Sequence, residues 1–234
     1  MADFDFDQFK KEFMDGVNSA ADAVSTAAKD ASGGFSRYVH FKEIGADLFL
    51  SGAITSHGGN LSECDGNTIW ITRTDSMLHH IGNSDIQRVY MSPTDLDQQA
   101  STELVVHRAM YQAWADKAIQ AQQPFGMRAI VHAHPKFTVF RSLIEDKITP
   151  IDCVGQMVLG ESVPVFDATA AIGSEEVATL MADHVTSGAS IGIIRGHGPF
   201  AIAETLQDAY RLVSCLEHSA ELLTLFEMTG RAKK

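Results

Sequence analysis

Two histidines separated by one residue, His132 and His134, stand in the segment Val131-His-Ala-His-Pro135. They follow an apolar run, which predicts a strand over 129–134 that ends in a loop at Pro135. Residues i and i+2 of a strand point to one face, so both imidazoles would converge, whereas in a helix they would diverge. Such a pair favours binding of a transition-metal ion, although satisfied polar packing is the structural alternative.

A third histidine, His197, stands in the same kind of place, at the end of an apolar run between Gly196 and Gly198. The two glycines remove bulk around the ring and permit unusual backbone angles. Three neutral imidazoles at strand ends, with one coordination position left open, describe a catalytic metal site. We therefore predict that His132, His134 and His197 bind a metal ion.

The best acid/base candidate is Glu103, in the first turn of a helix expected over 101–122. The helix dipole favours the ionised carboxylate there. Exposed capping carboxylates are common at such positions. Beside a metal, however, a carboxylate can move protons on a carbon next to a polarised oxygen.

Two short segments have the composition of an anion site. Ser101 and Thr102 offer hydroxyls and free N–H groups at the same helix terminus, and Gly58-Gly59-Asn60 forms a compact turn rich in backbone amides. Together they could hold a group such as phosphate. Neither segment alone indicates an anion site, because a glycine-rich turn usually serves only to reverse the direction of the chain.

The elements that must position these residues alternate between helices and strands. A hairpin is expected at Asp65-Gly66, with a return strand over 68–72. Further strands are expected over 129–134, 190–195 and 199–203, short strands and turns over 151–167, and helices over 36–50, 101–122, 135–146, 174–186 (N-cap Ser174) and 205–227. The Ala-rich segment before Ser32-Gly-Gly34 also reads as a helix. We therefore divide the chain into an N-terminal helical arm, 1–34, and one α/β domain, 35–234.

Bulk properties exclude several classes of protein. The chain has 234 residues, of which 45% are hydrophobic and 21% charged, as in ordinary globular proteins. A net charge of −12 argues against nucleic acid as the main partner. No apolar stretch approaches the roughly 18–20 residues of a membrane span. Three scattered cysteines and an acidic N-terminus, unlike a signal peptide, favour a cytoplasmic location.

Four ordered elements resemble the class II aldolase/adducin family, from about Ser36 to Gly230. The matching segments are Gly59-Asn60 for the family's first phosphate loop, Ser101-Thr102-Glu103 for its Ser-Ser-Glu element, His132-Ala133-His134-Pro135 for its His-x-His-Pro element, and Gly196-His197-Gly198 for its later Gly-His-Gly. The last helix, around Leu216 to Ala220, also looks like that of the family. The enzymes of this family include aldolases and a 4-epimerase that act on sugar phosphates, and the chain resembles its L-fuculose-1-phosphate aldolase-like members.

This resemblance implies a single three-layer domain with a central, mostly antiparallel sheet flanked by helices. It implies a homotetramer with fourfold symmetry and active sites at subunit interfaces. It also implies one divalent metal per subunit, most often Zn2+, with Mn2+, Co2+ or Fe2+ as alternatives, held by His132, His134 and His197. Glu103 is then a further ligand or the proton shuttle.

The activity implied is that of a metal-dependent aldolase, which splits a small ketose phosphate into dihydroxyacetone phosphate and an aldehyde through a metal-stabilised enediolate. Glu103 would carry the proton, and Gly59, Asn60, Thr74, Ser101 and Thr102 would hold the phosphate. A glutamate at position 103 favours an aldolase over an epimerase, because the resemblance implies an aspartate at this position in the family's epimerases. Sugar-phosphate 4-epimerase, decarboxylase and dehydratase activities on the same scaffold remain alternatives, as does a non-catalytic adducin-like scaffold.

Two departures from the family pattern concern the site. The family's Thr-Pro-Ser-Gly stretch, which helps grip phosphate, appears as Thr72-Arg73-Thr74-Asp75. An aspartate there would repel phosphate unless Arg73 compensates. The position of an interface tyrosine reads Ile148-Thr-Pro-Ile-Asp-Cys153, so Asp152 or Cys153 would stand in for it.

Overall fold

The structure is a computed structural model that describes residues 36–230. Its contacts divide the chain into a unit of Met1–Val39 and a unit of His40–Lys234, and the site lies in the second. The expected N-terminal arm, 1–34, lies outside the described residues, so the domain division at 34/35 stays a prediction. A helix occupies residues 36–50, as expected.

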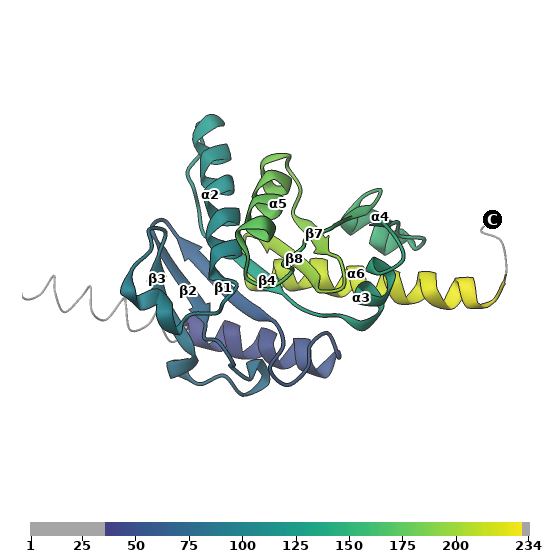
Figure 1. The fold of residues 1–234 in the computed structure, drawn as a ribbon, viewed down its shortest axis with the longest axis horizontal. Helices are drawn as coiled ribbons and strands as arrows, with labels where there is room; N and C mark the ends of the chain where they lie inside the picture. The colour runs from purple at the N-terminus through teal and green to yellow at the C-terminus, as the bar shows by residue number, and fades with distance from the viewer. Residues whose placement is uncertain (1–35, 231–234) are drawn as a thin grey trace, which may run out of the picture. The chain divides into compact units, whose positions relative to one another are not determined.

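Eight strands form one sheet in the order β3-β2-β1-β4-β8-β7-β6-β5 (Figure 1). Every neighbouring pair is antiparallel except β6 and β7, which are parallel. The strands are β1 Asn60–Asp65, β2 Thr68–Thr72, β3 Ile86–Tyr90, β4 Arg128–His132, β5 Lys147–Ile148, β6 Val163–Phe166, β7 Ile191–Ile194 and β8 Gly198–Ala203. A single, mostly antiparallel sheet flanked by helices is the fold expected from the sequence.

Helices cover both faces of this sheet (Figure 1). They are α2 Leu104–Gln120, α3 Lys136–Ser142, α4 Cys153–Leu159, α5 Glu175–Thr186 and α6 Leu206–Met228, with short 3-10 turns at Leu78–His80, Asn83–Asp85 and Asp95–Gln99. On β4, Ile130 packs in the core cluster shared with α2 and α5, while its fully buried neighbours Ala129 and Val131 point to the opposite face, which α6 covers. The strand carrying His132 is apolar throughout because both of its faces are buried.

Local signals placed several elements correctly. The β1–β2 hairpin pairs Asp65 with Thr68, and Gly66 in its turn has φ of 59°. Strand β2 has the expected bounds. The side chain of Ser174 caps α5 by accepting a hydrogen bond from the Val177 N–H at 3.1 Å.

Helix α4 is a correction, because only strands and turns were expected over 151–167. Asp152 caps it by accepting from the Gly155 N–H at 2.7 Å, and it also accepts from the Ser219 hydroxyl at 2.6 Å. These bonds explain why the pKa of Asp152 is lowered. The helix ends after two turns at Gly160, where φ is 78°. The sequence carried this N-cap signal, but too few apolar residues recur to reveal so short a helix.

Two whole-chain properties can be checked on the structure. Within residues 36–230, no helix combines the length and the apolar character needed to cross a bilayer. All three cysteines are free thiols: Cys64 is buried, Cys153 exposed and Cys215 half-buried.

Candidate metal centre

The three predicted histidines meet at one end of the sheet. The Nε2 atom of His132 lies 3.0 Å from Nε2 of His134 and 3.2 Å from Nε2 of His197. One nitrogen from each ring falls within 4.8 Å of the other two. Strand β4 places His132 beside β8, His134 lies in the loop that follows β4, and His197 lies in the turn that leads from β7 into β8.

The backbone route to this convergence differs from the expectation. Strand β4 ends at His132, so His134 lies in the following loop and the i, i+2 argument for a strand over 129–134 does not hold. Instead, the His134 N–H donates to the carbonyl of Ala53 at 3.0 Å. The two imidazoles still converge, because this loop is anchored from another part of the chain.

The glycine turn at 58–59 packs directly against His132 and His134. A Cβ at Gly59, where φ is 78°, would lie 2.7 Å from the carbonyl oxygen of His132. A Cβ at Gly58 would lie 2.9 Å from Nδ1 of His134. Both distances are shorter than real Cβ contacts, so the turn does more than reverse the chain: its glycines make room for the histidines.

Burial and mutual proximity keep the three imidazoles neutral. Burial, followed by its two histidine neighbours, holds the pKa of His132 well below its usual range. Burial and His197 lower the pKa of His134 to about 4, and burial lowers the pKa of His197. A neutral imidazole has a free nitrogen lone pair, and this neutral form is the one that binds a metal ion.

Hydrogen bonding selects the nitrogen of His132 that faces the other rings. Its Nδ1–H donates to the carbonyl oxygen of Pro199 at 2.9 Å, which leaves Nε2 as the lone-pair donor. The ring also stacks on Phe200, with centroids 3.9 Å apart. Three imidazoles whose nitrogens converge in this way fit a divalent ion such as zinc, which accepts nitrogen ligands and leaves a fourth position for a substrate.

Glu103 lies beside the histidines as the N-cap residue of α2, one position before the helix rather than in its first turn. Its side chain is buried, with Oε1 at 4.0 Å from Nε2 of His197 and accepting from the Gly173 N–H at 3.0 Å. Its other oxygen, Oε2, is buried without a hydrogen-bond partner in the described part of the chain.

The electrostatics of Glu103 differ from the expectation that the helix dipole would keep it ionised. Burial raises the pKa of Glu103 to about 7, and the Gly173 N–H opposes this shift only in part. A carboxylate with a pKa near the working pH can both accept and release a proton, which suits a general acid/base.

A cavity of about 170 Å³ is lined by all of the residues predicted to bind metal, carry the proton or hold phosphate, but not by Asp152 or Cys153, the expected stand-ins for an interface tyrosine. The three histidines and Glu103 line it, together with the five anion-binding candidates Gly59, Asn60, Thr74, Ser101 and Thr102. It is also lined by residues that the sequence prediction did not include among the site residues: His57, Arg73, Asp75, Ser76 and Ile172. His57 adjoins the glycine turn and had a local signal, whereas Ile172 comes from a distant loop and had none.

The anion-binding candidates differ in how their polar groups are used. The Thr74 hydroxyl donates to the Ala100 carbonyl at 2.8 Å, and the Ser101 hydroxyl accepts from the Glu103 N–H at 3.2 Å. The Asn60 side chain is buried, yet its Oδ1 has no partner among residues 36–230. A buried polar atom without a partner is costly, so Asn60 is well suited to meet a ligand.

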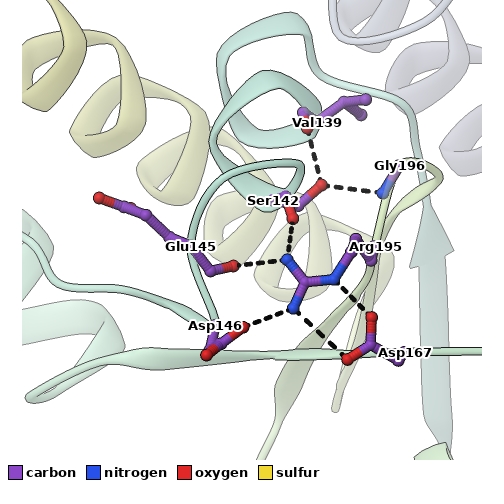
Figure 2. Close-up of polar contacts among 7 residues, drawn as sticks. All are labelled: Val139, Ser142, Glu145, Asp146, Asp167, Arg195 and Gly196. Carbon is purple, nitrogen blue, oxygen red and sulfur yellow. Dashed lines mark hydrogen bonds and ion pairs between the residues drawn. The ribbon is translucent and has the colours of Figure 1, made fainter.

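Arg195 fastens the loop that carries His197 (Figure 2). Its Nη1 donates to the carbonyls of Ser142 and Glu145 at 2.6 and 3.0 Å, and its other nitrogens bind Asp146 and Asp167. The Ser142 hydroxyl in turn accepts from the Gly196 N–H at 3.0 Å. Arg195 and Gly196, the two residues before His197, are thereby tied to the end of α3 and the segment that follows it. Helix α3 itself begins two residues after His134.

We expect Arg195→Gln to weaken binding of the metal about 10- to 100-fold while the protein stays folded, the usual cost of losing a residue that orients a ligand. The ion pairs with the exposed carboxylates of Asp146 and Asp167 contribute little, so stability should change modestly. Competition with a chromogenic chelator measures the affinity. Arg108→Gln is the matched control, because Arg108 also binds a carbonyl and an aspartate, those of Tyr90 and Asp97, outside the cavity. Equal metal affinity in the two variants would contradict a positioning role for Arg195.

The chain is similar over most of its length to one protein family. The family model described as "Class II Aldolase and Adducin N-terminal domain" matches residues 40–224. An L-fuculose phosphate aldolase from Methanocaldococcus jannaschii is 26% identical over 187 residues, which cover 79% of this chain and 94% of the relative.

Solved structures show the same likeness. The L-fuculose-1-phosphate aldolase from Thermus thermophilus superposes with a TM-score of 0.74 at 29% identity, covering 84% of this chain and 97% of that one. YgbL from Klebsiella pneumoniae, described only as a candidate aldolase, epimerase or decarboxylase, superposes with a TM-score of 0.69 at 23% identity, covering 86% and 93%. At that identity the second likeness concerns the fold alone.

Proposed function

Because the chain belongs to the class II aldolase and adducin N-terminal domain family, we propose that it is a metal-dependent aldolase that cleaves a small ketose phosphate into dihydroxyacetone phosphate and an aldehyde. One observation carries this proposal: three neutral imidazole nitrogens converge within 4.8 Å, and Glu103, whose Oε2 has no hydrogen-bond partner in the described part of the chain, lines the same cavity. An adducin-like scaffold would have no need of either feature.

His132, His134 and His197 are the proposed ligands of one divalent cation, and the all-nitrogen donor set favours zinc. When bound, the cation supplies Lewis-acid stabilisation of the negative charge that develops as the carbon–carbon bond breaks. The histidines contribute by geometry and by charge. They are neutral, Pro199 orients His132, Ala53 anchors the backbone of His134, and the three rings leave the side facing the cavity for the substrate.

Glu103 is the proposed proton carrier. In the cleavage direction it delivers a proton to the enediolate carbon, and in the synthetic direction it removes one from the same position. Oε1 is held by the Gly173 N–H, so the carboxylate is oriented and Oε2 is the atom left to exchange the proton. The raised pKa, about 7, lets both protonation states be populated near neutrality.

The phosphate is proposed to bind along the rest of the cavity wall. Gly59 and Asn60 contribute the turn before β1, and Ser101 and Thr102 contribute the start of α2. Thr74 supports this wall through its hydroxyl bond to Ala100, so its side chain needs to rotate before it can donate to the phosphate itself.

A homotetramer with sites at subunit interfaces is also proposed, since the region beside the histidines has an apolar surface. A second cavity, of about 540 Å³, is lined by His134 and His197 together with Val139, Phe140 and Leu143. The last two side chains are 48% and 59% exposed, which is unusual for large apolar groups next to a polar site. Light scattering of the purified protein tests this: a monomeric mass would contradict it.

The activity is tested with metal-loaded protein and a panel of ketose 1-phosphates. Cleavage is detected as dihydroxyacetone phosphate, through its reduction by a coupled NADH-dependent dehydrogenase. The His134→Ala variant, purified in parallel, controls for contaminating aldolases. We expect fragment formation that depends on added metal and is absent from the variant.

Other outcomes identify the alternatives. Conversion of a sugar phosphate to its epimer, with no fragments, would indicate an epimerase. Release of carbon dioxide or water from an acid substrate would indicate a decarboxylase or dehydratase. Protein that purifies without a stoichiometric divalent ion and takes none up would indicate a scaffold.

A further inference from the structure

The segment at 72–75, where the sequence departs from the family pattern, forms part of the cavity wall. Arg73, Thr74, Asp75 and Ser76 all line the cavity that reaches the three histidines. Among the described lining residues, Arg73 is the only arginine or lysine, so it is the only side chain there with a permanent positive charge. Asp75, two residues later, places a negative charge on the same wall.

The guanidinium of Arg73 is uncommitted while its backbone is fixed. Its N–H donates to the Asp85 carbonyl at 2.8 Å, and the residue bridges to Ala100 in an isolated antiparallel pair. Within residues 36–230 its side chain makes no ion pair and no hydrogen bond. In contrast, the guanidinium groups of Arg108, Arg141 and Arg195 are bound by carboxylates.

A second unpaired polar group lines the same cavity. Asn60 is only 6% exposed, and its Oδ1 has no partner in the described part of the chain. Its amide can turn over to present its N–H₂ group, since the two ends differ little in shape. A buried amide and a free guanidinium on one wall are the donors that a multiply charged oxyanion requires.

We propose that Arg73 binds the anionic group of the substrate, a phosphate, with Asn60 beside it, and that Asp75 weakens this binding by charge repulsion. This inference rests on the proposed function for the identity of the substrate, but not for the existence of the anion site. It assigns to an arginine side chain a task that the family's Thr-Pro-Ser-Gly stretch performs without one. Because residues 73 and 75 carry opposite charges, the proposal predicts opposite changes in phosphate affinity when each charge is removed.

The test measures binding of inorganic phosphate to metal-free protein by ³¹P NMR titration. Removing the metal excludes direct coordination of phosphate, and no turnover is needed. We expect Arg73→Gln to weaken binding about 10- to 100-fold, the range for hydrogen bonds to a charged group. Arg73→Lys, which keeps the charge and loses the fork, should weaken it less.

Asp75→Asn should tighten phosphate binding several-fold. This change is conservative for the backbone, because Asp75 has φ of 60°, a conformation that asparagine also tolerates. Arg108→Gln serves as the control and should bind phosphate as the wild type does. Phosphate affinity in Arg73→Gln equal to that of the wild type would overturn the proposal, as would weaker binding in Asp75→Asn.

Steady-state kinetics separate this proposal from the proposed function. With a cleavable ketose phosphate, Arg73→Gln should raise KM with kcat nearly unchanged, because the contact is the same in ground and transition states. With the dephosphorylated ketose, the variant and the wild type should be equal. If no ketose phosphate is cleaved at all but phosphate affinity still falls in Arg73→Gln, the proposed function fails and the anion site stands.

Discussion

His134→Ala is expected to lose the bound cation and all metal-dependent activity while the fold survives. The substitution removes one of three converging nitrogens, and the remaining pair should bind a divalent ion at least about 100-fold more weakly. The fold should tolerate the change, because His134 is half-buried and lies in a loop beyond the end of β4, outside the strand ladder.

Metal content after dialysis, measured by plasma mass spectrometry, and thermal unfolding followed by circular dichroism check this expectation together. His80→Ala is the matched control, since His80 is exposed and does not line the cavity. It should retain the metal content of the wild type. Stoichiometric metal in His134→Ala would remove His134 from the proposed ligand set, and loss of the unfolding transition would show a structural role instead.

Glu103→Gln is expected to keep the metal and lose at least about 100-fold in kcat. Glutamine has nearly the same shape and can still face the Gly173 N–H with its amide oxygen, but it cannot exchange a proton. General acid–base groups usually contribute about 10²- to 10⁴-fold. An unchanged kcat would reject Glu103 as the proton carrier. Loss of metal along with activity would instead favour the alternative role of Glu103 as a further ligand.

The same variant should change the pH dependence of stability in the metal-free protein. The pKa of Glu103 rises from an ordinary 4.5 to about 7 on folding. Its contribution to the free energy of unfolding of the wild type is therefore more favourable below pH 4.5 than at high pH. That contribution is lost as pH rises through 7, and at pH 8 the buried carboxylate costs on the order of 3 kcal/mol. Glutamine carries no charge at any pH. Metal-free Glu103→Gln should therefore unfold at a higher temperature than the wild type at pH 8, with the difference shrinking toward pH 4.

If the rise in unfolding temperature caused by Glu103→Gln were smaller at pH 8 than at pH 4, the raised pKa of Glu103 would be contradicted. Glu217→Gln is a comparison for carboxylate removal in general, because Glu217 accepts hydrogen bonds from the N–H groups of Phe137 and Thr138 outside the cavity. That carboxylate is used by the fold, so its removal should destabilise the protein at pH 8. Opposite signs for the two variants would separate a carboxylate kept for chemistry from one kept for structure.

Short-range patterns were enough to single out the candidate metal ligands of this chain. Residue types are local information, and so are the features that stop a strand or cap a helix. His132, His134 and His197 could be named because apolar runs, Pro135 and flanking glycines mark strand ends. The hairpin at Gly66 and the cap at Ser174 followed from the same kind of signal, because each depends on the conformation of only a few neighbouring residues.

Contacts between residues far apart in the sequence determined the positions of these side chains and the pKa of Glu103. The Ala53 carbonyl, 81 positions before His134, orients the loop that the strand pattern had misplaced. Burial by distant segments raises the pKa of Glu103 to about 7, although the Gly173 N–H and the helix terminus both favour the ionised form. Arg195 joins loops that are about 50 residues apart. Burial and desolvation depend on every segment that packs around a group, so they arise only when the whole sheet and its helices have assembled.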